Sequence, residues 1–290
     1  MAKKTSTTIT QKRSQWALVW GRMRRNKMAM GGLFIIIFLV IIAIFAPLIA
    51  PFDYNYQQLR HRFEAPNATH WFGTDNLGRD IFSRIIYGSR VSLQIGLISI
   101  GIATFVGGVI GSTSGYYGGR LDNIMMRIMD ILLAIPGTLF AISIVAALGP
   151  GIRNLMIAVA IGAIPVEARV IRASVMQVRD QEFIEAAKAA GTSDLRIIFK
   201  HILPNAMAQI IVQSTLGVAG AILSAAGLSF IGLGIQPPAP EWGAMLSEGR
   251  AYLRDHWHMT TFPGLAIMIT IFALNLLGDG LRDALDPKLK

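Results

Sequence analysis

The stretch that decides the fold is Gly31-Gly-Leu-Phe-Ile-Ile-Ile-Phe-Leu-Val-Ile-Ile-Ala-Ile-Phe-Ala-Pro-Leu-Ile-Ala50, which contains 20 residues and no charge. A helix of about 20 apolar residues spans the ~30 Å hydrocarbon core of a bilayer. The run begins too late and is too long for a cleaved signal peptide, whose apolar part covers about 7 to 15 residues. We therefore predict a first transmembrane helix over residues 31–50, ended by Pro47 and Pro51.

Composition extends the prediction of a membrane protein to the whole chain. Of the 290 residues, 53% are hydrophobic and 15% are charged, whereas a soluble domain carries about 25% charged residues. The chain has no cysteine, which excludes disulfides and thiolate metal sites. Its net charge of +10 is concentrated beside the long apolar runs. No helix-turn-helix, zinc-finger or RNA-binding motif accompanies that charge, so we expect no nucleic-acid partner.

Further apolar stretches predict an all-α membrane protein with six transmembrane helices. A basic segment, 1–30, precedes the first helix, and a loop, 51–90, follows it. The five-helix core covers residues 91–277, and a polar tail covers 278–290. Within the core, we predict spans at residues 91–119, 131–148, 154–166, 206–226 and 262–277. Pro136 is expected to kink or start the third span.

Three glycines mark a packing face on the second span. Gly107, Gly111 and Gly115 are four residues apart and therefore lie on one face of a helix. Small residues at this spacing let two helix backbones approach closely, which is how membrane helices associate without a hydrophobic driving force. We expect this face to contact another span.

The distribution of basic residues orients the six spans. An even number of spans places both termini on one side, and the segments of that side contain 19 Lys and Arg residues against 8 on the other. The positive-inside rule therefore puts both termini and the loop 167–205 in the cytoplasm, with the loop 51–90 outside. Trp16, Trp20 and Met23 also predict a short helix resting on the membrane surface in the N-terminal segment.

The loop between the fourth and fifth spans holds the most informative motif. It reads Asp180-Gln-Glu-Phe-Ile-Glu-Ala-Ala-Lys-Ala-Ala-Gly-Thr-Ser-Asp-Leu195 and closes with His201-Ile-Leu-Pro-Asn205. We expect Asp180 to cap a short helix that Gly191 ends in the left-handed conformation. One of residues 192–194 would cap a second helix, which Pro204 interrupts.

The predicted short helix has a shape suited to protein contact. Ala186 and Ala187 keep it slim, and Phe183 and Ile184 give it an apolar face. Such a helix, held out of the membrane, fits a groove on another protein. Helix physics alone favours the plainer alternative, an amphipathic connector between two spans.

The residues of this loop resemble the "EAA" signature of ABC importer permeases. In that family the loop forms a coupling helix, which docks on the ATP-hydrolysing subunit. The resemblance implies that the coupling residues of this chain are Glu185, Ala186, Ala187, Gly191, Leu203 and Pro204. His201 stands where many family members have Ile, although peptide-type permeases vary at this position.

Nearly the whole chain resembles the C-type permease subunit of dipeptide, oligopeptide and nickel importers, and dipeptide permeases most of all. The matching motifs are residues 72–80, 83–84, 226–234, 236–238, 240–243 and 278–287. The resemblance implies the type I permease fold of ABC importers, in the inner (plasma) membrane of a bacterium. It also implies a homologous permease chain, two ATP-binding subunits and an extracytoplasmic substrate-binding protein as partners. ATP and Mg would bind to the ATPase subunits, so we expect no cofactor in this chain.

Charged residues in the outer loops allow two interpretations. The first outer loop and its edge hold Asp75, Arg79, Asp80 and Arg84 close together, and the last outer loop holds Glu241 and Trp242. The charged side chains of the first loop, with Arg90 beside them, either cap and pair around a surface helix or help to seat the substrate-binding protein that the resemblance implies. In the second case Glu241 and Trp242 would take part. The sequence leaves both interpretations open.

No catalytic or metal site is predicted. The chain lacks the Gly-x-x-x-x-Gly-Lys-Ser/Thr phosphate loop, so it does not hydrolyse ATP by that route. Ser112 and Ser114 lie outside the Gly-x-Ser-x-Gly and Gly-x-Ser-Gly arrangements of serine proteases, and the predicted spans contain no His to act as a base. His256 and His258 would share a face only on a strand and have no third ligand beside them. We expect a polar loop there, anchored at the interface by Trp257.

Charge within a span would indicate a secondary transporter or an ion pathway. The candidates are Glu167, near the end of the short fourth span beside Arg169, and Asp279, at the end of the sixth. Both are expected where a helix meets water, as solvated or paired side chains. This expectation weakens the alternative of a proton-coupled carrier.

Overall fold

The computed structural model describes residues 15–285, and the described part is helical without a β-strand. Predictions that concern residues 1–14 and 286–290 lie outside the described residues. The helices are α1 (Gln15–Met23), α2 (Lys27–Ile44), α3 (Ala46–Ile49), α4 (Ile81–Tyr117), α5 (Gly119–Ala134), α6 (Gly137–Leu148), α7 (Ile152–Arg179), α8 (Glu182–Ala189), α9 (Asp194–Arg196), α10 (Leu203–Phe230), α11 (Trp242–Gly249) and α12 (His258–Leu285). A π-helical turn, η2 (Ile197–Ile202), joins α9 to α10. The predicted all-α fold is confirmed.

Five helices are long and apolar enough to cross a membrane: α2, α4, α7, α12 and the continuous run Asp194–Phe230. The pair α5 and α6 passes the same test together but bends by 88°. Pro136 immediately precedes α6, where its missing N–H leaves no helical bond unmade. Counted as one broken span, this pair completes the predicted six. The prediction of one helix over 131–148 is wrong, because residues 131–134 end α5.

Several helices extend beyond the apolar runs that predict them. α4 begins at Ile81, α7 continues to Arg179 and α12 continues to Leu285. These helices therefore reach into the predicted loops 51–90 and 167–205 and into the predicted tail 278–290. A charged residue was expected to end a span, but a helix continues through such positions when the side chains find partners inside the bundle.

The first span begins four residues earlier than the uncharged run. Asn26 caps α2, because its side-chain oxygen accepts hydrogen bonds from the backbone N–H groups of Met28 and Ala29, both at 3.1 Å. Pro47 does not end the helical segment as predicted. It lies in the first turn of α3, where proline is tolerated, and the helix breaks at Phe45 instead.

The glycine face of α4 forms a close helix pairing in the core. A Cβ built on Gly111 would lie 2.4 Å from the carbonyl oxygen of Ala168, and one on Gly115 would lie 2.9 Å from that of Arg172. Gly107 approaches the α7 backbone equally closely, with its Cβ position 2.9 Å from the Ala168 nitrogen. The predicted contact face is therefore confirmed, with α7 as its partner.

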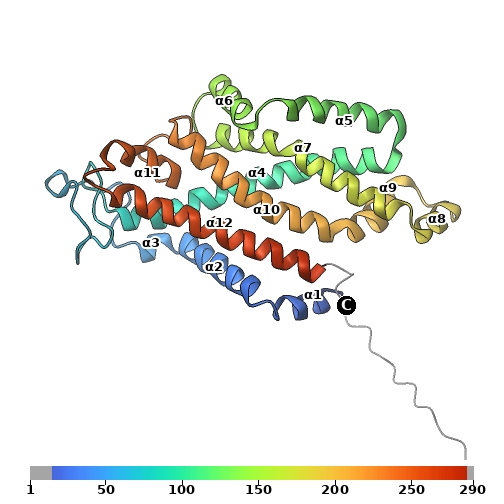
Figure 1. The fold of residues 1–290 in the computed structure, drawn as a ribbon, viewed down its shortest axis with the longest axis horizontal. Helices are drawn as coiled ribbons and strands as arrows, with labels where there is room; N and C mark the ends of the chain where they lie inside the picture. Colours follow the sequence, from blue (N-terminus) through green and yellow to red (C-terminus); the bar gives the residue numbers. More distant parts are fainter. Residues whose placement is uncertain (1–14, 286–290) are drawn as a thin grey trace, which may run out of the picture.

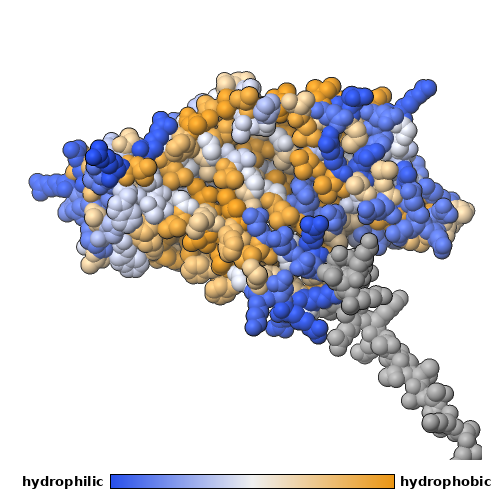
Figure 2. Space-filling view, in the orientation of Figure 1, coloured by the Kyte–Doolittle hydropathy of each residue, from blue (hydrophilic) through white to orange (hydrophobic). Residues whose placement is uncertain are grey.

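The elongated bundle has two polar ends and an apolar middle. α10 lies between α7 and α12, and α2 lies along α12 (Figure 1). The first outer loop and α11 lie at one end of the bundle, which we call the α11 end (Figure 1). The opposite end, which we call the α8 end, contains α8, α9, α1 and the end of α12 (Figure 1). Hydrophobic residues cover the middle of the surface and hydrophilic residues gather at both ends (Figure 2). Such a band is the surface that a bilayer covers.

Candidate functional sites

The loop with the EAA-like motif, residues 180–205 and called the α8 loop below, contains the short helix α8. Gly191 has a φ of +76°, the left-handed conformation that was predicted. The helix end is closed by hydrogen bonds from the Gly191 N–H to the Lys188 oxygen (2.9 Å) and from the Thr192 N–H to the Ala187 oxygen (3.1 Å). The predicted cap by Asp180 is wrong: this residue ends α7, and its carboxylate pairs with Arg179 at 2.9 Å.

The two apolar residues of α8 point in different directions, which corrects the predicted single apolar face. Ile184 is fully buried against the chain's own core, beside Ile197 and Ile202. Phe183 is 42% exposed. Consecutive residues of a helix lie about 100° apart, so only one of them faces the core here. Ile184 therefore fixes α8 on the helical bundle, and the side chain of Phe183 remains exposed for a contact outside it.

Polar contacts tie the α8 loop to the end of α4. The Tyr116 hydroxyl donates to the Asp194 carboxylate at 2.7 Å, and the Lys188 ammonium lies 5.3 Å from the centre of the Tyr116 ring. The Arg179 guanidinium donates to the Gly115 carbonyl at 2.9 Å. The α8 loop therefore contacts α4 at Tyr116, and Arg179 joins the end of α7 to the adjacent residue of α4.

Pro204 does not interrupt the second helix of the loop, contrary to the prediction. The backbone widens into the π-helical turn η2, in which the Leu203 N–H bonds to the Ile198 oxygen, and α10 follows without a break. The Asn205 side chain donates to the His201 carbonyl at 2.6 Å. A π-helical turn re-registers the backbone bonds, so it accommodates a proline that cannot donate one.

The surface of the α8 loop combines charge with large exposed apolar side chains. Leu195 and Phe199 are 67% and 66% exposed, in addition to Phe183. Glu185 and Lys188 are also exposed. Apolar side chains of this size at a polar end of a protein are typical of an interaction surface.

At the opposite end, a buried charge network joins the first outer loop to α4 and α11. The Arg79 guanidinium contacts Asp75 at 2.6 Å and Glu248 of α11 at 2.7 Å. Arg84 contacts the same Glu248 oxygen at 3.1 Å. Asp75, Arg79 and Arg84 are each at most 4% exposed. Buried charges of this kind are stable only with such partners.

Two buried carboxylates of this end cap helices. Asp80 accepts from the Ser83 N–H at 2.7 Å at the start of α4, and its other oxygen lies 2.9 Å from His70. Glu241 accepts from the backbone N–H groups of Gly243 and Ala244, both at 2.8 Å, at the start of α11. Burial raises the pKa of Glu241, and these N–H donors oppose that shift.

The predicted outer residues lie at the same end of the bundle, where Asp75, Arg79 and Arg84 share one charge network, but all six are buried. Trp242 is 1% exposed, and its indole N–H donates to the Ile85 carbonyl at 3.1 Å. Asp75, Arg79, Asp80 and Arg84 cap and pair at the start of α4, in line with the first of the two interpretations. A role of these residues in seating a partner stays a prediction.

The outer histidines also have structural partners. His258 is buried and lies 3.2 Å from the Thr74 carbonyl, and the His256 ring stacks on Phe63 with 4.3 Å between ring centres. Within residues 15–285, no three His, Cys, Asp or Glu side chains are placed to hold a metal ion.

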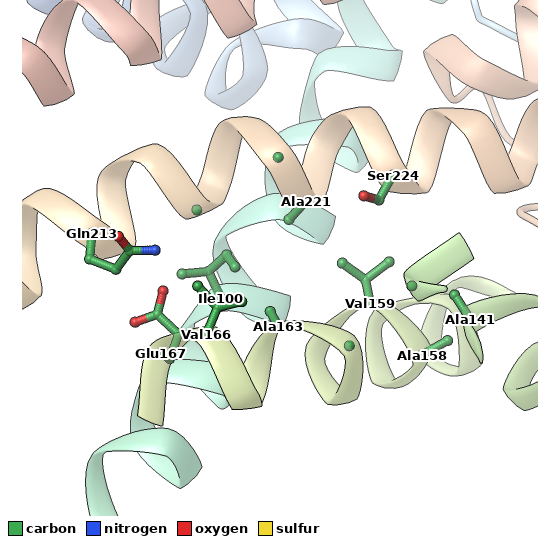
Figure 3. Close-up of a pocket in the computed structure, with 14 residues that line it drawn as sticks. Ile100, Ala141, Ala158, Val159, Ala163, Val166, Glu167, Gln213, Ala221 and Ser224 are labelled. Carbon is green, nitrogen blue, oxygen red and sulfur yellow. The ribbon is translucent and has the colours of Figure 1, made fainter. Parts of the chain in front are cut away.

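A pocket of about 250 Å³ lies in the middle of the bundle, between α4, α6, α7 and α10 (Figure 3). Small and apolar residues form most of its lining, and Glu167 and Gln213 lie together on one side of it (Figure 3). Glu167 is 1% exposed, which corrects the prediction that it meets water at a helix end. The error follows from ending the fourth span too early, since α7 continues for twelve residues beyond Glu167.

Sequence reasoning missed this pocket, although a signal was present. No Gly or Pro follows Glu167 before Asp180, so a helix that reaches Glu167 has no reason to stop there. Arg169, its expected neighbour, is exposed and pairs with Asp130 of α5 instead.

Comparisons with known proteins identify similar membrane proteins over nearly the whole chain. The binding-protein-dependent transport system inner membrane component matches residues 107–290, and the N-terminal TM domain of oligopeptide transport permease C matches residues 14–66. The chain is 50% identical over 277 residues to the dipeptide transport system permease protein of Alkalihalophilus pseudofirmus, covering 96% of this chain and 91% of that protein. It is 49% identical over 281 residues to the glutathione transport system permease protein of Escherichia coli, covering 97% and 93%.

Solved structures show the same fold. Two inward-facing conformations of the MetNI methionine ABC transporter have TM-scores of 0.59 and 0.55 with this chain, at 18% and 19% identity. They cover 70% and 71% of this chain and 96% and 98% of theirs. The chain therefore belongs to the inner-membrane components of binding-protein-dependent transport systems, as a multi-pass ABC importer permease with the type I fold and not as an enzyme.

Proposed function

We propose that this chain forms one half of a path that carries dipeptides or other short peptides across the bacterial inner membrane. The observation that carries the proposal is its 50% identity, over 96% of its length, to a dipeptide transport system permease protein. A relative at 49% identity is named for glutathione, which is itself a short peptide. Short peptides are the solute class that these two names share.

The second half of the path is a homologous permease chain. The central pocket supports this, because its rim residues Val166, Gly220 and Ser224 are exposed on the surface of the single chain. Lipid would otherwise face an open pocket whose lining includes the polar side chains of Glu167, Gln213 and Ser224. A partner permease that covers the rim would enclose the pocket between the two chains.

ATP hydrolysis by two ATP-binding subunits, which hold the ATP and Mg, drives transport through the α8 loop. Glu185 and Ala186 lie on the exposed side of α8, where a partner can reach them, and Ala187 packs toward the core. Gly191 sets the angle at which α8 ends, and Leu203 and Pro204 form the joint between η2 and α10. These six residues are the proposed coupling site, and movement of α8 would act on α4 and α7 through Tyr116 and Arg179.

The α8 end faces the cytoplasm with both termini, and the α11 end receives an extracytoplasmic substrate-binding protein. The 19 to 8 distribution of basic residues supports this orientation. Single cysteines at Asn67 and Ser193, both exposed, test it. A membrane-impermeant thiol reagent applied from outside should label the first, and the second only after the membrane is opened. Equal labelling of both in sealed cells contradicts the orientation.

Reconstitution tests the function itself. Proteoliposomes that contain this chain, its permease partner and the ATPase subunits would be supplied with the binding protein and with labelled alanyl-alanine or glutathione. Uptake should require ATP and every subunit, and this chain alone should hydrolyse no ATP. Absence of ATP-dependent uptake of both probes by the complete complex would remove short peptides as the solute class.

A further inference from the structure

The buried carboxylate of Glu167 is the least expected group in this membrane domain. It lies within the span α7, at 1% exposure, and in the described part of the chain it belongs to no ion pair. The other described acidic residue buried among the long helices, Asp122, is paired with Arg172. An ionised carboxylate without a cation is costly inside a bilayer, and such residues face a bundle interior or a solvent-filled path.

The surroundings of Glu167 hold it in place without neutralising it. The Thr104 hydroxyl of α4 lies 3.2 Å from one carboxylate oxygen and 2.9 Å from the Ser214 hydroxyl of α10. The Gln213 side chain also hydrogen-bonds the carboxylate. These partners are neutral, so they orient the carboxylate but do not balance its negative charge.

Two glycines make the room that Glu167 occupies. A Cβ on Gly217 of α10 would lie 3.3 Å from a Glu167 carboxylate oxygen, and a Cβ on Gly107 of α4 would lie 2.9 Å from the Glu167 Cβ. The side chain therefore extends between α4 and α10 beside the pocket (Figure 3). Among the described residues that line this pocket, Glu167 is the one with an ionisable side chain.

We infer that Glu167 and Gln213 form a subsite for the α-ammonium group of a peptide during transport. This inference rests on the proposed function. The ammonium supplies the cation that the carboxylate lacks, and its three N–H donors match two carboxylate oxygens and the Gln213 carbonyl oxygen. Alanyl-alanine and glutathione both carry this group. The small residues of the remaining lining contact the rest of the solute without selecting side chains.

The test compares peptide import with ATP hydrolysis in the complete reconstituted complex. Glu167→Gln keeps a side-chain oxygen that accepts from Thr104 but removes the charge. Peptide imported per ATP hydrolysed should fall at least tenfold, while ATP hydrolysis stimulated by loaded binding protein stays within twofold. Glu167→Asp, which keeps the charge, should recover part of the loss. Asp130→Asn makes the same change at an exposed carboxylate and should alter neither quantity.

A purely structural role for Glu167 predicts a different pattern. Thr104→Val removes the hydrogen bonds of the Thr104 hydroxyl to Glu167 and Ser214 and keeps the charge of Glu167. A helix-joining role would therefore make Thr104→Val and Glu167→Gln lower the Tm alike and leave peptide per ATP unchanged. That pattern would overturn the subsite and leave the proposed function intact. Import of neither probe by the wild-type complex would instead remove the peptide function, and the subsite with it. A decrease in peptide imported per ATP hydrolysed in Glu167→Gln, for whichever probe the wild type imports, supports the subsite.

Discussion

The two polar ends of the molecule use charged loop motifs in opposite ways. At the α11 end, the six residues predicted as an outer site are each at most 4% exposed, and their partners lie within the chain. At the α8 end, Glu185 and Ala186 are exposed beside Phe183, Leu195 and Phe199. The side chains of the first motif are satisfied within the chain, whereas those of the second remain exposed to a partner, as the proposed coupling role requires. Because of this difference in burial, we predict that substitutions at the α11 end lower stability most, and that substitutions at exposed positions of the α8 end lower transport most.

The largest expected effect on stability is at the α11 end. Arg84→Ala removes a guanidinium that is 1% exposed and leaves Glu248 with one cation fewer. Loss of one partner of a buried ion pair costs about 3–5 kcal/mol. Thermal unfolding of the purified protein in mild detergent should therefore show a large decrease in Tm.

Arg90→Ala is the matched control for this prediction. Arg90 lies on the same helix α4 but is exposed, so its loss should change the free energy of unfolding by about 0.5 kcal/mol or less. Equal Tm values for the two variants would mean that the network does not stabilise the α11 end.

A smaller effect is expected at Gly191, where α8 ends. Its φ of +76° is strained for a β-branched residue, at a cost of about 1–3 kcal/mol for Gly191→Val. No atom lies within 4 Å of a Cβ built there, so the cost comes from the backbone alone. Gly191→Asn tolerates this conformation and should retain most of the stability and uptake that Gly191→Val loses. Equal uptake by both variants and the wild type would show that the angle of α8 is not critical.

The fold class and the family could be predicted because their signals are local in sequence. An uncharged run predicts a span, and Gly191 predicts a left-handed helix end. The four-residue spacing of Gly107, Gly111 and Gly115 predicts a packing face. The outer network could not be predicted in the same way. Arg79 and Glu248 are 169 residues apart, and no single-sequence signal pairs them.

The position of charges along the helices explains the remaining errors. Treating each charge as the end of a span shortened α4 and α7, which placed Glu167 at a water boundary and hid the central pocket. The partner of a buried charge comes from another helix, as when Asp122 of α5 meets Arg172 of α7. Likewise, the core cluster behind Ile184 decides which side of α8 faces inward, and α8 alone does not show it.

The smallest effect on stability, with a large effect on transport, is expected at Glu185. Its side chain is exposed, so Glu185→Lys should change the free energy of unfolding by about 0.5 kcal/mol or less. At a docked interface, like charges brought together cost several kcal/mol. Peptide uptake should therefore fall sharply, with the ATPase subunits lost from the complex or no longer stimulated by loaded binding protein. Co-purification and uptake measure these two outcomes separately.

Asp255→Lys makes the same charge reversal at an exposed position of the α11 end, so it should leave the ATPase subunits bound to the complex. The pair of variants therefore separates a general effect of charge from a contact made by α8. If the Glu185→Lys complex imports peptide at the normal rate with all subunits present, α8 is not the coupling element. The two ends would then differ in burial but not in function, because the exposed α8 loop would contribute no more to transport than the buried network does.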